Sequence, residues 1–161
     1  MDYYLCPFVE LFTEQAEKEC RVITIFEHAV LPPDQYALSE SYCLDPDCDC
    51  RRVMLNVLPR LGKRCLATIS FGFDRDEEMA GPFLDPLNPQ SEYAQTLLKL
   101  VEKLVLSDPA YVARLESHYR QVKEAVRNPS PAVQRVMRRH AMYGEDTPPR
   151  SRRTGRTRRR K

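Results

Sequence analysis

The chain has 161 residues, of which 42% are hydrophobic, and this is enough for one domain with a core of its own. Its net charge of +2 is unevenly distributed. Eight of the 25 Lys and Arg residues lie between Arg150 and Lys161, so residues 1–149 carry 17 basic and 23 acidic groups. The opening residues lack the pattern of a signal peptide, and no stretch approaches the roughly 18 apolar residues of a membrane span. We therefore expect a cytoplasmic protein without a membrane segment, whose six cysteines stay reduced.

The first half of the chain predicts a short helix followed by four strands. Apolar residues at helical spacing indicate the helix over residues 8–19. Segments rich in β-branched and aromatic residues indicate strands over 21–27, 36–42, 52–58 and 64–73. Prolines separate the first two strands, and a glycine-containing turn separates the last two. We therefore expect an antiparallel meander.

Two long helices are predicted in the second half, after a proline-rich extended segment. Ser91 is the expected N-cap of the first helix. Asp108 is the expected N-cap of the second, with Pro109 at the first helical position. Pro129 and Pro131 end the second helix, and Pro131 can open a third. Both long helices carry an apolar stripe that can pack on the meander.

These elements predict one α+β metal-binding domain over residues 1–145. It consists of a four-stranded antiparallel β-meander packed with two long C-terminal helices and a short N-terminal helix. Residues 146–161 contain no apolar residue and predict a disordered basic tail. Its charge suits contacts with the phosphates of RNA or DNA through Arg152, Arg153, Arg156, Arg158, Arg159, Arg160 and Lys161. The tail lacks aromatic residues for base stacking, and a purely solvated segment, or one that folds back on the acidic body, is an equal interpretation.

Cys43, Cys48 and Cys50 lie within eight residues, and this spacing predicts a metal site. Structural zinc sites use four thiolate or imidazole ligands, so one ligand must come from elsewhere. A hairpin that turned at residues 31–33 would place Cys20 beside Cys43. We therefore predict a four-cysteine zinc site formed by Cys20, Cys43, Cys48 and Cys50.

The remaining candidate ligands are less well placed. Cys65 is expected about 23 Å along its strand from the loop cysteines, and His28 lies at the far end of the first strand. Cys6 is neither placed nor excluded. Three other interpretations stay open: buried or incidental cysteines, a disulfide between Cys20 and Cys43 in an oxidising compartment, and an open catalytic zinc site with water as the fourth ligand.

Residues 36–53 (YALSESYCLDPDCDCRRV), 84–93 and 108–123 together resemble an uncharacterised bacterial family, and the resemblance covers most of residues 20–127. Some members of that family carry a C-terminal SEC-C type zinc motif, which implies translocation or ribosomal partners. The present chain has no cysteine beyond Arg127, so this motif is absent and the basic tail occupies its position. The resemblance implies no activity.

The sequence therefore predicts a zinc-stabilised interaction module with an unknown protein partner. A nucleic-acid or ribosome-associated binder that acts through the tail is one alternative. A metal-dependent hydrolase with an open cysteine site is another. Neither a P-loop nor a dinucleotide-binding glycine pattern occurs among the five glycines, so neither device supports nucleotide binding.

Overall fold

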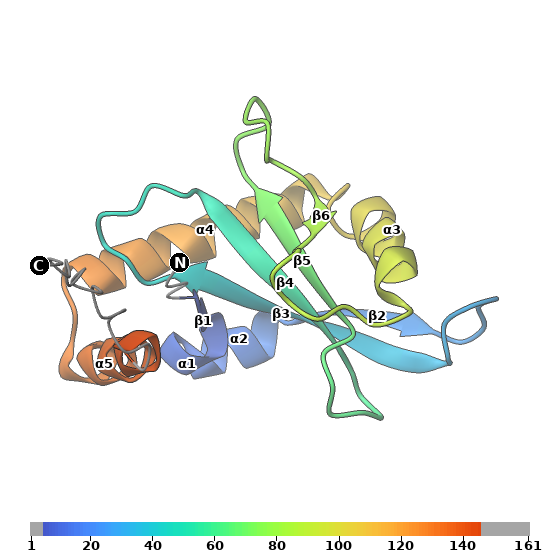
Figure 1. Ribbon diagram of the computed structural model, residues 1–161, viewed down its shortest axis with the longest axis horizontal. Coiled ribbons are helices and arrows are strands. Elements are labelled where there is room, and N and C mark those ends of the chain that lie inside the picture. The colour runs from blue at the N-terminus through green and yellow to red at the C-terminus, as the bar shows by residue number, and fades with distance from the viewer. Residues whose placement is uncertain (1–4, 146–161) are drawn as a thin grey trace, which may run out of the picture.

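The computed structural model describes residues 5–145, which form one antiparallel sheet with helices packed against it (Figure 1). The strands are β1 (Leu5–Pro7), β2 (Arg21–Ile25), β3 (Asp34–Cys43), β4 (Arg52–Pro59), β5 (Ala67–Gly72) and β6 (Phe83–Leu84). The helices are α1 (Phe8–Leu11), α2 (Thr13–Glu19), α3 (Ala94–Leu104), α4 (Pro109–Arg127) and α5 (Pro131–Glu145). The predicted α+β class is confirmed, but the described sheet has six strands and not four. The unpredicted strands, β1 and β6, have only three and two residues, too few for an alternating pattern to show.

The long strand β3 is the centre of this architecture. One edge of β3 pairs with β4, and β5 and β6 follow in order. The other edge is shared by two short strands: β1 pairs with the end of β3, where Leu5 lies opposite Cys43, and β2 pairs with its beginning, where Ile25 lies opposite Asp34. The connection between β1 and β2 contains α1 and α2. The N-terminal segment therefore pairs with both ends of β3.

The register of the first hairpin differs from the predicted one. Arg21 lies opposite Leu38, which places the turn before the prolines instead of at them. The cause is local, because Nδ1 of His28 accepts hydrogen bonds from the backbone amides of Val30 and Leu31 at 3.0 and 3.1 Å. These bonds reverse the chain early, so β3 starts sooner than its hydrophobic pattern suggests.

Helix ends follow the predicted caps in part. Asp108 accepts a hydrogen bond from the backbone N–H of Ala110 at 3.0 Å, with a proline at the first helical position, as predicted for α4. Helix α5 begins at Pro131. Ser91, by contrast, caps the turn before α3: its Oγ accepts the N–H of Tyr93, and the helix begins one residue later. The predicted N-terminal helix is divided into α1 and α2.

A buried histidine fastens α4 to the sheet. The side chain of His118 is only 2% exposed, and its ring nitrogens each lie 2.6 Å from a carboxylate, Nδ1 from Glu40 and Nε2 from Glu19. Its ring stacks on Phe8, with centroids 4.2 Å apart. The hydroxyl of Tyr42 donates a second hydrogen bond to Glu40 at 2.7 Å. Four elements, α1, α2, β3 and α4, therefore meet at one ring.

This contact pattern stabilises the charged form of the ring. Each nitrogen faces a carboxyl group, and an ionised carboxylate accepts but does not donate, so a ring with hydrogen on both nitrogens can donate to both. Burial acts to lower the pKa of His118, but the hydrogen bonds and charges of Glu40 and Glu19 outweigh it and raise this pKa. The hydrogen bond from His118 in turn lowers the pKa of Glu19.

The two faces of β3 contact different parts of the molecule. Glu40 and Tyr42 point towards the helices, where Tyr42 also donates to the carbonyl of Leu115 in α4 at 3.2 Å. Because side chains alternate along a strand, Ser41 and Cys43 point to the opposite face. The β3 and β4 registers place Arg52 and Met54 of β4 on that same face. The cysteine loop therefore begins on the side of the sheet away from α4.

Candidate metal centre

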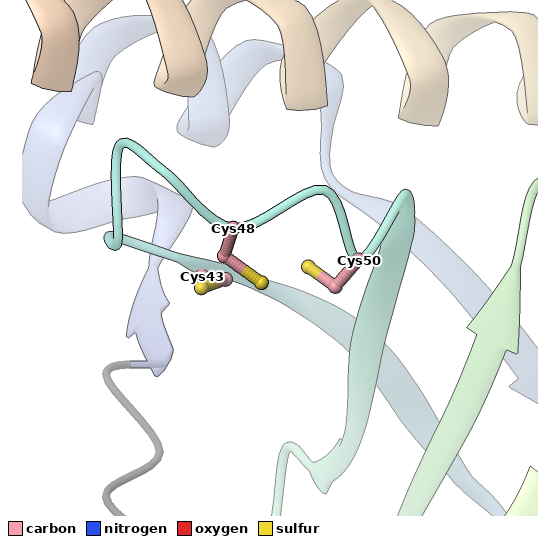
Figure 2. A group of neighbouring side chains, drawn as sticks. All are labelled: Cys43, Cys48 and Cys50. Atoms are coloured by element: carbon pink, nitrogen blue, oxygen red, sulfur yellow. The ribbon is translucent and has the colours of Figure 1, made fainter.

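Three of the predicted ligands converge where β3 ends and β4 begins (Figure 2). Cys43 is the last residue of β3, Cys48 lies in the connecting loop, and Cys50 lies just before β4. In Figure 2 the sulfur atoms of Cys48 and Cys50 point toward each other, with Cys43 beside them. The three Sγ atoms lie within 4.8 Å of one another, and all three residues are half-buried.

The donor set fits a thiolate-binding ion. A tetrahedral zinc site with Zn–S bonds of about 2.3 Å places its sulfur atoms about 3.8 Å apart. The three Sγ atoms all lie within 4.8 Å of one another, so their spacing is compatible with such a site. Soft thiolates favour zinc and related ions over magnesium or calcium. The cluster can hold a metal ion through three of the four positions of a tetrahedron.

The loop is held in place by its own hydrogen bonds and by α4. Asp45 accepts the backbone N–H of Asp47 through Oδ1 at 2.9 Å, and its carbonyl accepts the N–H of Cys48 at 3.3 Å. The ammonium group of Lys123 donates to the same carbonyl at 2.7 Å, although this lysine is only 4% exposed. These contacts hold the segment of the loop that carries Cys48.

The end of the loop is fixed in a less common conformation. Arg51 has a φ of 38°, in the left-handed region that residues other than glycine rarely adopt. Its N–H donates to the hydroxyl of Tyr119 at 3.3 Å, and its carbonyl accepts the N–H of Phe73 at 2.9 Å. These two contacts maintain the turn that brings Cys50 back towards the end of β3.

The thiols differ in acidity. A hydrogen bond with the Cys50 side chain lowers the pKa of Cys43 to about 6 against the opposing effect of burial, with help from the backbone of Asp45 and the charge of Lys123. The same hydrogen bond, together with burial, raises the pKa of Cys50. One thiolate is thus stabilised by its neighbour's proton, and a bound cation would take the place of that proton.

The other cysteines do not join this cluster. The prediction of Cys20 as fourth ligand rested on a register that the structure does not have. The observed register places Cys20 four residues along β3 from Cys43, about 13 Å away, with its Sγ near the carbonyl of Leu38. Cys65 lies outside the cluster, as expected, and its thiol donates to the carbonyl of Ala67 at 3.2 Å. All six cysteines are free, so no disulfide forms between Cys20 and Cys43.

A cavity of about 400 Å³ adjoins the three thiols, and its polar lining includes Arg52, Ser70 and Asp85. The guanidinium group of Arg52 donates to Oγ of Ser70 at 3.2 Å and to the carbonyl of Met79, and it lies over the ring of Phe83. Among residues 5–141, whose side chains are described, no fourth His, Cys, Asp or Glu completes the cluster. Three of the four positions of a tetrahedral site therefore have donors among these residues.

The predicted nucleic-acid contacts, from Arg152 to Lys161, lie outside the described residues, as does the predicted disordered tail. None of the helices within residues 5–145 is both long and apolar enough to cross a membrane. No protein-family model, no curated protein and no solved structure matches the chain. The resemblance to a bacterial family consequently stays a prediction, and the function must be argued from the site itself.

Proposed function

We propose that this protein is a zinc-stabilised interaction module in which Cys43, Cys48 and Cys50 hold the ion and a partner molecule supplies the fourth donor. The convergence of three thiols beside a cavity is the observation that carries the proposal. A site closed by four cysteines would only stabilise the fold, whereas a three-thiolate site also offers a binding position. When bound, zinc supplies a Lewis-acidic centre at that position.

The chain's own residues prepare this position. Lys123 and Tyr119 hold the loop against α4, so the thiols need little reorganisation to bind the ion. Arg52 fixes the cavity wall through Ser70 and retains N–H groups that can bind a carboxylate or carbonyl oxygen. The partner we expect is therefore a protein segment that presents a metal-binding side chain next to an acidic or polar group.

Metal analysis of the purified full-length protein tests the proposal. The double variant Cys48→Ser, Cys50→Ser should lose one equivalent of zinc relative to the parent and should melt at a lower temperature, because metal binding to the folded state adds to its stability. Cys20→Ser and Cys65→Ser are matched controls that should keep this equivalent. Unchanged zinc content in the double variant would contradict the proposal.

Cobalt substitution tests the open position separately. Cobalt in the cluster should give thiolate-to-metal charge-transfer absorption in the parent that exceeds the absorption of the double variant. Azide added to the cobalt-loaded proteins should shift the ligand-field bands of this difference spectrum if the fourth position exchanges with solvent. An unchanged spectrum would mean that the fourth position is closed, and the interaction module would be reduced to a structural site.

A metal-dependent hydrolase is the second candidate, and the cavity beside the thiols is the observation that favours it. The open position would then hold the reacting water, and Arg52 would bind an anionic substrate. Zinc-dependent cleavage of generic esters or phosphodiesters that is lost in the double variant would support this candidate. An open position in the cobalt spectrum without any turnover would favour the interaction module.

A further inference from the structure

A second group of metal-binding side chains lies near the same end of β3. Cys6 comes from β1, Glu10 from α1 and His140 from α5, so the group joins segments about 130 residues apart. One donor atom from each residue lies within 4.8 Å of the other two. Cys6 pairs with Tyr42, which faces the helices, whereas Cys43 faces the opposite side of the sheet. The two groups are thus separate sites on opposite faces.

The geometry already resembles a partly assembled coordination sphere. Nε2 of His140 lies 3.1 Å from Oε2 of Glu10, and both side chains are partly accessible to solvent. The Cys6 thiol is buried, and its one hydrogen bond within the described residues is a long contact of 3.5 Å with the carbonyl of Pro7. Its sulfur therefore has no strong hydrogen bond to lose, but burial and the charge of Glu10 raise the pKa of the Cys6 thiol to about 12, so a bound ion would have to displace this proton. Sulfur, imidazole nitrogen and carboxylate oxygen are the three donor types that zinc uses.

A simple ion pair is the competing explanation, because Arg139 also contacts Oε2 of Glu10 at 3.0 Å. The Arg139 side chain is 57% exposed, so water can solvate its guanidinium group if a metal ion takes its place. An ion pair among Glu10, Arg139 and His140 makes no use of the Cys6 sulfur, which belongs to the buried core beside them. A divalent ion would use all three ligand atoms.

We propose that Cys6, Glu10 and His140 form a second site for a divalent ion of the zinc class, which fastens α5 to α1. Three protein ligands leave one tetrahedral position for water or an added ligand. Metal binding at this site would couple the N-terminal strand to the last described helix. That helix directly precedes the basic segment 146–161 in the sequence, so its attachment fixes where this segment starts.

Cobalt titration of the full-length, metal-free protein tests this site by stoichiometry. The parent should bind two equivalents, and His140→Ala and Glu10→Gln should each bind one. The double variant Cys48→Ser, Cys50→Ser should also bind one, and its combination with His140→Ala should bind none. Glu14→Gln changes an exposed glutamate outside the group and should keep both equivalents. Two equivalents retained by His140→Ala, or only one bound by the parent, would overturn the proposal.

Hydrogen exchange provides a second readout, which begins with the parent protein itself. Zinc added to the metal-free parent should slow amide exchange in α5, and the double cysteine-loop variant should show the same protection. Exchange in α5 that does not change with zinc in either protein would refute a role in fastening the helix. If zinc still slows amide exchange in α5 of His140→Ala, other ligands must cause this protection, and the proposed site would also be refuted.

Discussion

Replacement of His118 by alanine is expected to destabilise the fold by about 3–5 kcal/mol, because it removes the positive partner of a buried carboxylate. The Glu40 side chain is 7% exposed, so water cannot replace the lost ion pair. Glu19 adds little to this cost, since its side chain is 38% exposed and solvent screens its charge. The variant also leaves a cavity against the ring of Phe8.

The pH dependence has a definite sign. Because the folded-state pKa of His118 is raised, its contribution is fully present below the ordinary value of 6.5 and is lost as the pH rises through the folded value. Because the pKa of Glu19 is lowered, its contribution is present above 4.5 and is lost as the pH falls through the folded value. The network therefore stabilises the parent most at pH values between the folded-state pKa values of Glu19 and His118. Alkaline pH should reduce the difference in free energy of unfolding between the parent and His118→Ala.

Urea unfolding of the parent and His118→Ala at pH 6 and pH 9 measures both effects. Lys103→Ala is the control, since Lys103 is exposed and lies outside this network. The addition of Glu40→Gln to His118→Ala should recover part of the loss, because it removes the unpaired buried charge. A cost below about 1 kcal/mol for His118→Ala at pH 6 would refute the ion-pair interpretation.

Three further outcomes are expected. Lys123→Met should release the carbonyl of Asp45 and speed the transfer of zinc to a chelator, whereas Lys103→Met, at an exposed position, should not. Asp108→Ala should lower the free energy of unfolding by about 1 kcal/mol, because α4 loses its N-cap; thermal or urea unfolding measures this change. Deletion of residues 150–161 should abolish salt-dependent retardation of a generic RNA, and equal binding by the truncated protein would exclude the tail as the binding segment.

Local signals were sufficient for much of the fold. The strands β3, β4 and β5 were predicted because each is a continuous run with turn residues at both ends. The caps at Asp108 and Pro131 were predicted because capping depends on a few adjacent residues. The proximity of the three loop cysteines likewise follows from a short connection between two paired strands.

The missing parts depend on contacts that short patterns do not contain. The hairpin register was displaced by a single imidazole acceptor, His28, and this displacement moved Cys20 away from the predicted site. The carboxylate partners of His118 lie 78 and 99 residues away in sequence. One signal for this network was present: Glu40 occupies the same face of β3 as Leu38 and Tyr42, and a charged residue in a core-facing position requires a buried partner.

Helix α4 sets the relative positions of the thiols. Through His118 it is paired to β3, the strand that ends in Cys43. Through Tyr119 and Lys123, one turn apart on the same helix, it holds the loop that carries Cys50. The strand and the loop are thus both attached to one helix, which holds the three sulfur atoms close together. The site is therefore largely preorganised for a metal ion. Because the loop is already ordered, ordering it would take away little of the free energy of metal binding.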